Sequence, residues 1–231
     1  MTPRRPADPG RERRRLAALN YFERQAFERG LRLVGGVDEV GRGPLAGPVV
    51  AACVVSERPL LLEGLDDSKV VPPQRRERLA VTIREMCTAW SIGSASAAEI
   101  DQLNIYRATV LAMERALAGL AISPDCLLVD AMRIPAFGGE QQALIHGDAR
   151  SSTIAAASII AKVHRDGLLV ELHERFPAYG FDEHKGYGTQ RHIEALREHG
   201  PTPEHRRSFV EHLLRAVPLF PDAAPDPGGA P

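Results

Sequence analysis

Residues 35–50 read GGVDEVGRGPLAGPVV, and this stretch decides how the rest of the chain is interpreted. It joins two apolar runs, which predict one strand over residues 32–39 and a second over residues 47–56. The adjacent acids Asp38 and Glu39 stand where the first of these strands ends. Burying acids at the end of a core strand costs free energy unless they are paired or bind a cation.

Glycines follow the two acids at Gly41, Gly43 and Gly47. Because glycine has no side chain, a ligand can approach the backbone closely there. Acids beside an open backbone suggest a divalent metal held next to a phosphate-bearing substrate. An ordinary β-hairpin turn is the alternative explanation for the glycines. Consecutive side chains on a strand point to opposite faces, so both acids can serve one site only if the strand ends or bulges near Gly41.

Composition sets the broad class of the protein. A chain of 231 residues with 44% hydrophobic content can bury the core of one domain. No segment approaches the roughly 20 apolar residues of a membrane span, and no apolar signal segment follows the charged N-terminus. Three cysteines among apolar neighbours indicate core residues in a reducing cytosol, so we expect a cytoplasmic protein. The net charge of −1 is indecisive for nucleic acid, because nine arginines stand before residue 33.

The organisation along the chain predicts an α/β protein with a mixed β-sheet flanked by helices. Residues 1–15 are rich in Arg and Pro and residues 217–231 in Pro and Gly, so we expect both to be disordered tails. Residues 16–216 form one domain, whose part from about residue 176 is a small helical C-terminal element. Periodicity predicts helices over residues 16–28, 72–86, 97–102, 104–119 and 151–175, and further strands over residues 88–96, 126–130 and 143–146.

Four acids share a context that points to a metal site. Asp38 and Glu39 end the first strand, Asp130 ends the apolar strand CLLVD, and Asp148 precedes a long helix. Ligands of open α/β sheets bind outside strand ends, so these acids can converge. Oxygen ligands suit Mg²⁺ or Mn²⁺, and two ions roughly 4 Å apart could activate a water and stabilise the leaving oxygen of a phosphodiester. No Cys/His cluster has zinc spacing. For Asp148, a helix cap is the alternative.

Six ordered blocks carry a family resemblance: GVDEVGRGPLAGPVVAA, LDDSK, NIYRATVLAM, LLVDAMRIP, GDARSSTIAAASIIAKVHRD and YGFDEHKGYGTQRH. Over about residues 33–210 the chain resembles bacterial ribonuclease HII. The resemblance implies an RNase H-like fold and a metal-dependent endoribonuclease that cuts RNA in RNA–DNA hybrids. It also implies cleavage on the 5′ side of ribonucleotides embedded in duplex DNA, leaving 3′-hydroxyl and 5′-phosphate ends. Removal of ribonucleotides during DNA repair and replication would follow.

The resemblance also assigns site residues. The family's metal-binding carboxylates, which hold two Mn²⁺ or Mg²⁺ ions, fall on the four acids above. The loop of Gly41, Arg42 and Gly43 corresponds to the sensor of the ribose 2′-hydroxyl, and Tyr187 to a tyrosine stacked on a neighbouring sugar. Lys69 corresponds to a phosphate contact, although the family's usual second lysine is Val70 here. Weaker candidates for phosphate contacts are Ser151, Ser152, Lys162, Arg165, His184 and Lys185.

Other charged residues are expected to have structural or surface roles and no part in catalysis. Asp166 lies one helical turn from Lys162 and is expected to be its ion-pair partner. Seven of the eight histidines lie beyond residue 160, and we interpret them as titratable surface groups without a catalytic role.

Alternatives and partners complete the expectations. One alternative is a catalytically silent hybrid-binding module, which should have lost at least one carboxylate, whereas all four are present. Another is a nucleotide-metabolising enzyme that cradles phosphate, which needs its glycine loop between a strand and a helix, whereas this loop is predicted to lie between two strands. Ribonuclease HIII usually has an extra N-terminal domain, for which about 30 residues before the first strand leave no room. We expect a monomer that binds RNA–DNA hybrids or ribonucleotide-containing DNA, without a membrane. The C-terminal tail has no convincing motif for a sliding clamp.

Overall fold

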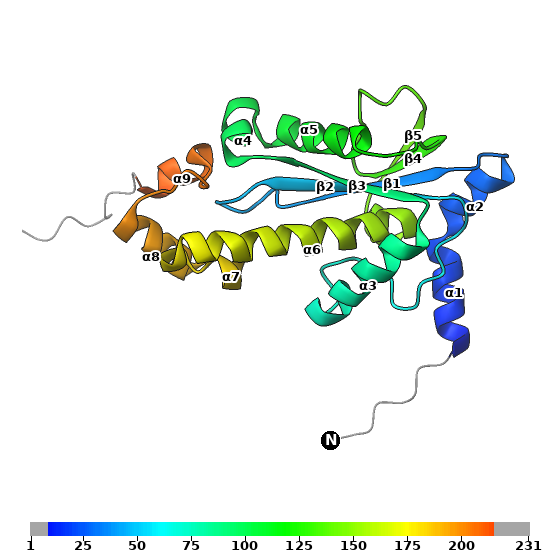
Figure 1. Ribbon diagram of the computed structural model, residues 1–231, viewed down its shortest axis with the longest axis horizontal. Helices are drawn as coiled ribbons and strands as arrows, with labels where there is room; N and C mark the ends of the chain where they lie inside the picture. The colour runs from blue at the N-terminus through cyan, green and yellow to red at the C-terminus, as the bar shows by residue number, and fades with distance from the viewer. Residues whose placement is uncertain (1–8, 215–231) are drawn as a thin grey trace, which may run out of the picture.

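The computed structural model describes residues 9–214, which fold around one five-stranded sheet (Figure 1). The strands lie side by side in the order β3-β2-β1-β4-β5. β1 pairs with β2, and β2 with β3, in antiparallel fashion, whereas β1–β4 and β4–β5 are parallel. The predicted α/β class with a mixed sheet is therefore confirmed. The strand bounds are Val34–Val40 (β1), Val49–Ser56 (β2), Ala89–Ala95 (β3), Cys126–Asp130 (β4) and Glu140–Leu144 (β5).

Helices cover both faces of the sheet. The long helix α6 lies along one face together with α3, and α5 with α4 covers the other (Figure 1). The short helices α7, α8 and α9 gather at the far end of α6 (Figure 1). The helix bounds are Pro9–Leu19 (α1), Tyr21–Glu28 (α2), Pro73–Met86 (α3), Ala97–Leu103 (α4), Ile105–Ala118 (α5), Ser152–Arg175 (α6), Phe181–His184 (α7), Gln190–His199 (α8) and Arg207–Leu214 (α9), with single 3₁₀ turns at Gly147–Ala149 (η1) and Pro177–Tyr179 (η2).

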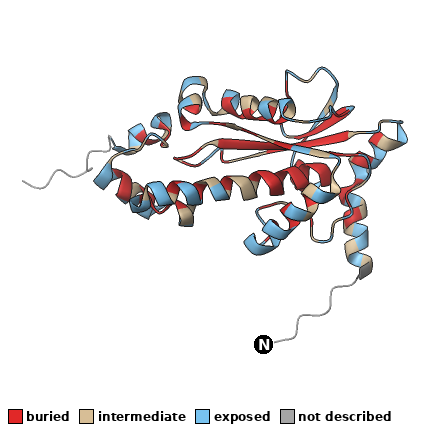
Figure 2. Cartoon of the chain, viewed as in Figure 1, coloured by how far each residue is buried: buried red, intermediate tan, exposed pale blue. Residues whose placement is uncertain are grey.

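Two glycines let the long helices press directly on the strands. A Cβ atom added to Gly36 of β1 would lie 2.2 Å from the carbonyl carbon of Thr153 in α6. On the opposite face, a Cβ added to Gly93 of β3 would lie 2.2 Å from the carbonyl oxygen of Ala112 in α5. Small residues at these positions therefore fix both helices in close contact with the sheet. Figure 2 shows the result, with the central strands β1, β2 and β4 and the first half of α6 largely buried.

The C-terminal element has a small core of its own. Tyr179, Phe181, Leu196 and Val210 bury their side chains against Leu169, which belongs to the second half of α6. The element is helical, as predicted, and it contains α7, α8 and α9. It is attached to the end of α6 instead of covering the sheet.

The N-terminal prediction needs a correction. Residues 9–15, which we expected to be disordered, form the first part of α1. Arg15 anchors that helix, because its guanidinium donates to the carbonyl of Leu65 at 2.7 Å and to Glu12. The remaining parts of the two predicted tails, residues 1–8 and 217–231, lie outside the described residues.

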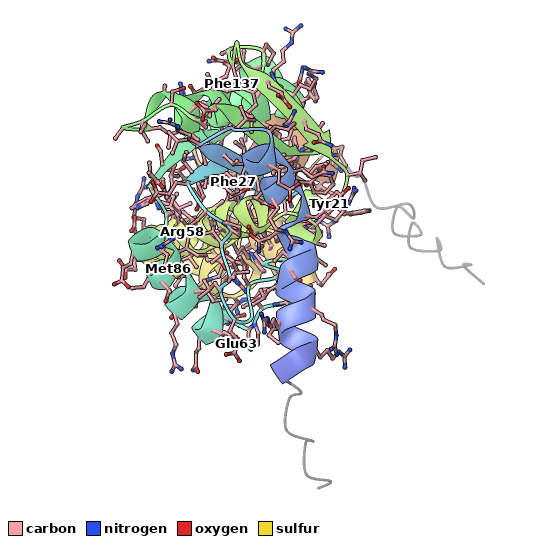
Figure 3. The ribbon with its side chains drawn as sticks, turned by 90° about the vertical axis from the view of Figure 1, so that its right-hand side faces the viewer. Tyr21, Phe27, Arg58, Glu63, Met86 and Phe137 are labelled. Atoms are coloured by element: carbon pink, nitrogen blue, oxygen red, sulfur yellow. The ribbon has the colours of Figure 1, made fainter. Side chains whose placement is uncertain are left out.

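The helix expected over residues 16–28 is divided at Asn20, whose buried side-chain amide donates to the carbonyls of Leu16 and Leu60. Figure 3 views this end of the molecule, with Tyr21 and Phe27 of α2 beside the sheet, Phe137 above it and Met86 below. One strand was also misplaced, since β5 spans Glu140–Leu144 and not residues 143–146. Its sequence EQQAL has no apolar alternation that could have marked it.

Two predictions about membranes and cysteines can be compared with the structure. Among the described residues, no helix combines the length and the apolar character that crossing a membrane requires. Cys53, Cys87 and Cys126 are free thiols, and the first and last of them are buried. They are packing residues, as the sequence indicated.

Candidate active site

Asp38 and Glu39 lie on the part of β1 that extends beyond its pairing with the parallel strand β4. β1 pairs with β2 without a bulge up to Val40, but its pairing with β4 stops at Val37, the partner of Val129. Asp130 follows Val129 directly, so Asp38 and Asp130 come to the same end of two adjacent strands. The strand itself ends at Val40, directly before Gly41 with its φ of 91°, so the expected strand end near Gly41 is present, while the pairing with β4 already stops before the two acids.

The register assigns Asp38 and Glu39 to different faces. Gly36 touches α6, so Asp38, two residues further, lies on the α6 face, where Ser158 is a hydrogen-bond neighbour. Glu39 lies on the opposite face, like the core residue Val37 beneath α5. The two acids thus point to different faces of the sheet, and Asp38 shares its face with α6, the helix that follows Asp148.

Electrostatics tie the four acids together. Burial raises the pKa of Asp38 well above its ordinary value, and the charges of Glu39 and Asp130 add to the shift. Burial likewise raises the pKa of Glu39, opposed by Arg42. The pKa of Asp148 is raised by burial, then by Asp67 and Asp130. These shifts are typical of like charges that are gathered out of water without enough positive charge.

The hydrogen bonds of these carboxylates are incomplete. Glu39 receives a hydrogen bond from the Arg42 guanidinium at 3.2 Å through Oε1, while its buried Oε2 has no partner among the described residues. Asp130 Oδ1 accepts the backbone N–H of Gly147 at 2.7 Å. The Lys69 ammonium lies 3.7 Å from Asp148 Oδ2, although its side chain is 79% exposed. The buried Oε2 of Glu39 is therefore one of the acceptors at this site that the protein itself leaves without a donor.

Divalent ions fit this donor set. Within residues 9–214, no three acidic, histidine or cysteine side chains already surround one point as a closed metal cage. Mg²⁺ does not need such a cage, because it keeps waters and is held by one or two carboxylates plus substrate phosphates. The donors are all oxygens, which suits Mg²⁺ or Mn²⁺ and not zinc. The residues that would hold the ions are Asp38, Glu39, Asp130 and Asp148.

The glycine loop and Tyr187 lie next to each other. Arg42 and Gly43 are exposed at the tip of the loop between β1 and β2. A Cβ added to Gly43 would lie 3.8 Å from the ring of Tyr187, which is 46% exposed. Leu45 N–H donates to the carbonyl of Gly186 at 2.8 Å, so the backbone joins the two segments. The structure therefore brings together the loop and the tyrosine that the sequence separated by more than a hundred residues.

Several candidate phosphate contacts are instead structural. Ser151 is fully buried, and its hydroxyl donates to Glu23 at 2.6 Å while it caps α6. Ser152 is buried and donates to Asn20. These two predictions are wrong, because neither hydroxyl is accessible and both tie α6 to α2.

Three further candidates are occupied inside the protein. The fully buried Arg165 donates to the carbonyls of Pro48, Ala46 and Lys185. Lys185 itself donates to the carbonyl of Asp182, and His184 makes a hydrogen bond with the carbonyl of Tyr179. Phosphate contacts are thus not supported for Arg165, His184 or Lys185, and Arg165 fastens the loop after β1 to α6.

Lys162 is mostly covered and pairs with Asp166 at 2.6 Å. The predicted ion pair is confirmed, and Arg76 joins it from α3 at 3.0 Å from the same carboxylate. Lys162 is thereby engaged in linking two helices, which leaves Lys69 as the more accessible lysine of the site.

Sequence reasoning missed two buried groups beside the loop. Arg206 is fully buried and donates to the carbonyls of Gly41, Arg42 and Gly47. His192 and His205 are buried, which corrects their interpretation as surface histidines. Their ring nitrogens Nε2 lie 3.0 Å apart. The short motif HRRS offered no periodic signal that could have shown this burial.

Comparisons with known proteins identify the family of the chain. A model of the family described as ribonuclease HII matches residues 35–212. Ribonuclease HII of Geobacillus thermodenitrificans (strain NG80-2) is 53% identical over 198 residues, which cover 86% of this chain and 76% of that protein. The crystal structure of ribonuclease H2 from Pyrococcus horikoshii OT3 is similar with a TM-score of 0.68 and 26% identity, covering 79% of this chain and 97% of that chain.

A more distant structure shows the same fold. The crystal structure of Bst-RNase HIII in complex with Mn²⁺ matches with a TM-score of 0.61 at 17% identity, over 82% of this chain and 72% of that one. The RNase H-like fold expected from the sequence is confirmed by these neighbours. With four acids at one end of the sheet and a family model spanning nearly the whole described chain, this protein belongs to the ribonuclease HII family and is a hydrolase of the nuclease class.

Proposed function

We propose that this chain is an endoribonuclease that hydrolyses the RNA strand of RNA–DNA hybrids and cuts on the 5′ side of ribonucleotides embedded in duplex DNA. The products are 3′-hydroxyl and 5′-phosphate ends. The observation that carries the proposal is the position of the exposed loop tip beside Tyr187, on the segment that directly follows the acids of β1. Two of the four acids and the loop that would read the ribose therefore belong to one continuous stretch of chain, which Tyr187 contacts from the C-terminal element.

The loop and the tyrosine have the chemistry of a ribose reader. Only the 2′-hydroxyl distinguishes RNA from DNA at a given nucleotide, so a reader must come within hydrogen-bond distance of it. The exposed backbone at Gly43 allows this approach, whereas Gly41 is buried against Arg165 and supports the loop from below. The exposed ring of Tyr187 offers a flat surface to a neighbouring sugar, where a deoxyribose fits and a 2′-hydroxyl does not. A junction between RNA and DNA satisfies both contacts.

The carboxylates supply the chemistry of cleavage. Two bound Mg²⁺ or Mn²⁺ ions would stabilise the attacking and leaving oxygens of an in-line displacement at phosphorus. Asp38 and Asp130 would hold the ions from the ends of β1 and β4, and Asp148 would add a carboxylate from η1, just before α6. Exposed Lys69 is placed to meet a substrate phosphate near Asp148. We further propose that the enzyme acts as a cytoplasmic monomer in the removal of ribonucleotides from DNA.

The test is the variant Asp130→Asn on a DNA duplex that contains one ribonucleotide. We expect cleavage in Mg²⁺ and in Mn²⁺ to fall by about a thousandfold, the order of loss found when a transition-state charge partner is removed. The control is Glu85→Gln, which neutralises an exposed acid of α3. Cleavage by Asp130→Asn at the wild-type rate, or cleavage products with 3′-phosphate ends, would contradict the proposal.

The same experiment separates the binding-only alternative. A silent hybrid-binding module would bind the one-ribonucleotide duplex but leave it intact in both metals. The grouping of Asp38, Glu39, Asp130 and Asp148 supports an enzyme, since a binding module has no need for like charges that raise one another's pKa values.

A further inference from the structure

The dipeptide His205–Arg206 contacts both halves of the proposed ribose reader. It lies between α8 and α9, in a segment whose backbone is bonded to the loop after β1. Arg206 N–H donates to Leu45 O at 2.9 Å, and Gly47 N–H donates to Glu204 O at 2.9 Å. The loop that begins at Gly41 is thus held by the C-terminal element rather than by the sheet.

Arg206 holds this loop by hydrogen bonds to the backbone carbonyls of the loop. Its guanidinium donates to Gly41 O at 2.5 Å, to Arg42 O at 2.9 Å and to Gly47 O at 2.9 and 3.1 Å. All four hydrogen bonds end on backbone oxygens. A fully buried arginine is expensive, and burial lowers its pKa to about 9. The planar fork of guanidinium donors is the group suited to hold several carbonyls at fixed angles.

The hydrogen bonds from Arg206 fix the direction in which the peptide N–H groups of the loop point. In a trans peptide, the N–H of one residue points away from the carbonyl of the residue before it. No cis peptide bond occurs among the described residues. Because the carbonyls of Gly41 and Arg42 point inward to Arg206, the N–H groups of Arg42 and Gly43 point outward at the exposed tip. Two successive outward N–H groups form a donor pair for a ligand oxygen.

His205 reaches the other half of the reader through His192. Thr202 N–H donates to His205 Nδ1 at 3.0 Å, so the proton of a neutral His205 sits on Nε2. His205 Nε2 then donates to His192 Nε2 at 3.0 Å, and His192 Nδ1 donates to the carbonyl of Tyr187 at 2.9 Å. This directional chain of hydrogen bonds needs both rings neutral, and it fixes the backbone that carries the Tyr187 ring.

We propose that His205 and Arg206 are positioning residues that set the spacing between the Gly41–Gly43 loop and Tyr187. They thereby determine how strictly the enzyme distinguishes a ribonucleotide from a deoxyribonucleotide. Neither side chain touches substrate, because both are buried. The inference rests on the proposed function, since it assigns a cause to the selectivity of that same site.

The test measures discrimination and not only activity. Binding of a one-ribonucleotide duplex and of the matching all-DNA duplex is compared by fluorescence anisotropy in Ca²⁺, and the ratio of the two dissociation constants is the readout. We expect Arg206→Gln to reduce this ratio at least tenfold, and His205→Gln to reduce it severalfold. Arg207→Gln, the neighbouring exposed arginine, is the matched control and should keep the wild-type ratio.

A purely structural role predicts a different result. It would lower the fraction of active protein, so kcat would fall while the binding ratio stayed at the wild-type value. Near-UV circular dichroism confirms that each variant is folded at the temperature used. Arg206→Lys, which retains the charge but offers fewer donors, covers the case in which Arg206→Gln does not fold, and it should give an intermediate ratio.

Two outcomes overturn the inference, and they differ from each other. If the wild type discriminates and folded Arg206→Lys, Arg206→Gln and His205→Gln discriminate equally well, only the positioning role is wrong. If the wild type neither discriminates nor cleaves the one-ribonucleotide duplex, the proposed function fails together with the selectivity that these residues were inferred to set.

Discussion

Two neighbouring groups of charged side chains in this molecule are shielded from water, and they differ in how many of their hydrogen-bond partners the chain itself supplies. The buried arginines Arg165 and Arg206 find all their partners within the chain, as backbone carbonyls. Among the acids, Asp38 accepts the N–H of Glu39, but one oxygen of Glu39 has no partner among the described residues. The two arginines thus have their hydrogen bonds within the chain, whereas we propose that the acids are completed by bound cations.

This difference separates groups that hold the fold from groups that perform a reaction. Breaking a satisfied buried charge leaves its former partners without hydrogen bonds, which destabilises the protein. Removing an unsatisfied charge relieves repulsion, so stability rises while function is lost. Stability and activity should therefore respond in opposite directions in the two regions.

The largest effect is expected at Asp38. In Asp38→Asn, turnover of a one-ribonucleotide duplex should fall about a thousandfold, because a carboxylate that holds the ions is lost. The Tm without metal should rise, because the neutral amide removes a buried like charge next to Glu39 and Asp130. Calorimetry and initial rates measure both quantities.

Added Mg²⁺ sharpens this result. The ion binds only the folded state, so it should raise the Tm of the wild type more than that of Asp38→Asn. A variant that is both inactive and less stable than the wild type would place Asp38 among the groups that hold the fold, and the contrast between the two regions would not hold.

The opposite response is expected at Arg165. Arg165→Met should lower the free energy of unfolding by at least about 4 kcal/mol, because three carbonyls lose their donor at a buried site. Urea denaturation measures the change. Arg78→Met on the exposed side of α3 is the control and should stay within about 0.5 kcal/mol of the wild type. A loss below about 1 kcal/mol would show that water replaces the guanidinium easily.

Low pH should destabilise the protein through the hydrogen-bonded pair of His192 and His205. Burial lowers the pKa of His192 and of His205 to about 4, from 6.5. The unfolded chain therefore binds more protons between these two values. The stability contribution is complete above pH 6.5 and is lost as the pH falls toward 4, on the order of 3 kcal/mol for each histidine.

The acid cluster responds in the other direction, because its raised pKa values make protonation favour the folded state. Its contribution is present at low pH and is lost as the pH rises through the folded pKa values. Unfolding curves from pH 4 to pH 8 for the wild type and His192→Gln separate the two contributions. The variant should show a weaker loss of stability below pH 6.5, and an unchanged profile would contradict the buried neutral pair.

The smallest effect is expected at Lys69. Its side chain is largely exposed and lies 3.7 Å from Asp148, so Lys69→Gln should lower kcat/KM only severalfold. The salt dependence of substrate binding should lose about one unit of slope, as expected for one phosphate contact. A loss of more than a hundredfold with an unchanged salt slope would instead make Lys69 part of the ion-holding group.

Much of the fold could be predicted from local signals. The start of α3 follows from Pro72 and Pro73, and α4 begins with the capping box of Ser96 and Glu99. The four acids could be grouped because each follows or precedes a recognisable element. These signals act over a few residues, which is the range at which sequence patterns are informative.

What could not be predicted depends on distant partners. Ser151 and Arg165 looked like polar surface groups, and only the packing of α2 and of the loop after β1 makes them internal. Arg206 stands beside Arg207 in the same short motif, yet one is buried and the other exposed. Neither hydropathy nor periodicity distinguishes two adjacent arginines. Their difference exists only once the loop carbonyls of Gly41 and Arg42 are in place.

His205 and Arg206 lie late in the sequence, which has a consequence for the synthesis of the chain. All five strands have been made by Leu144, and the last of the four acids by Asp148. The residues that brace the reading loop are added more than fifty residues later. During translation, the four acids thus leave the ribosome before the segment that holds the loop. If His205 and Arg206 set the selectivity as we propose, a chain that ends before them has all four acids but lacks the residues that make the enzyme selective.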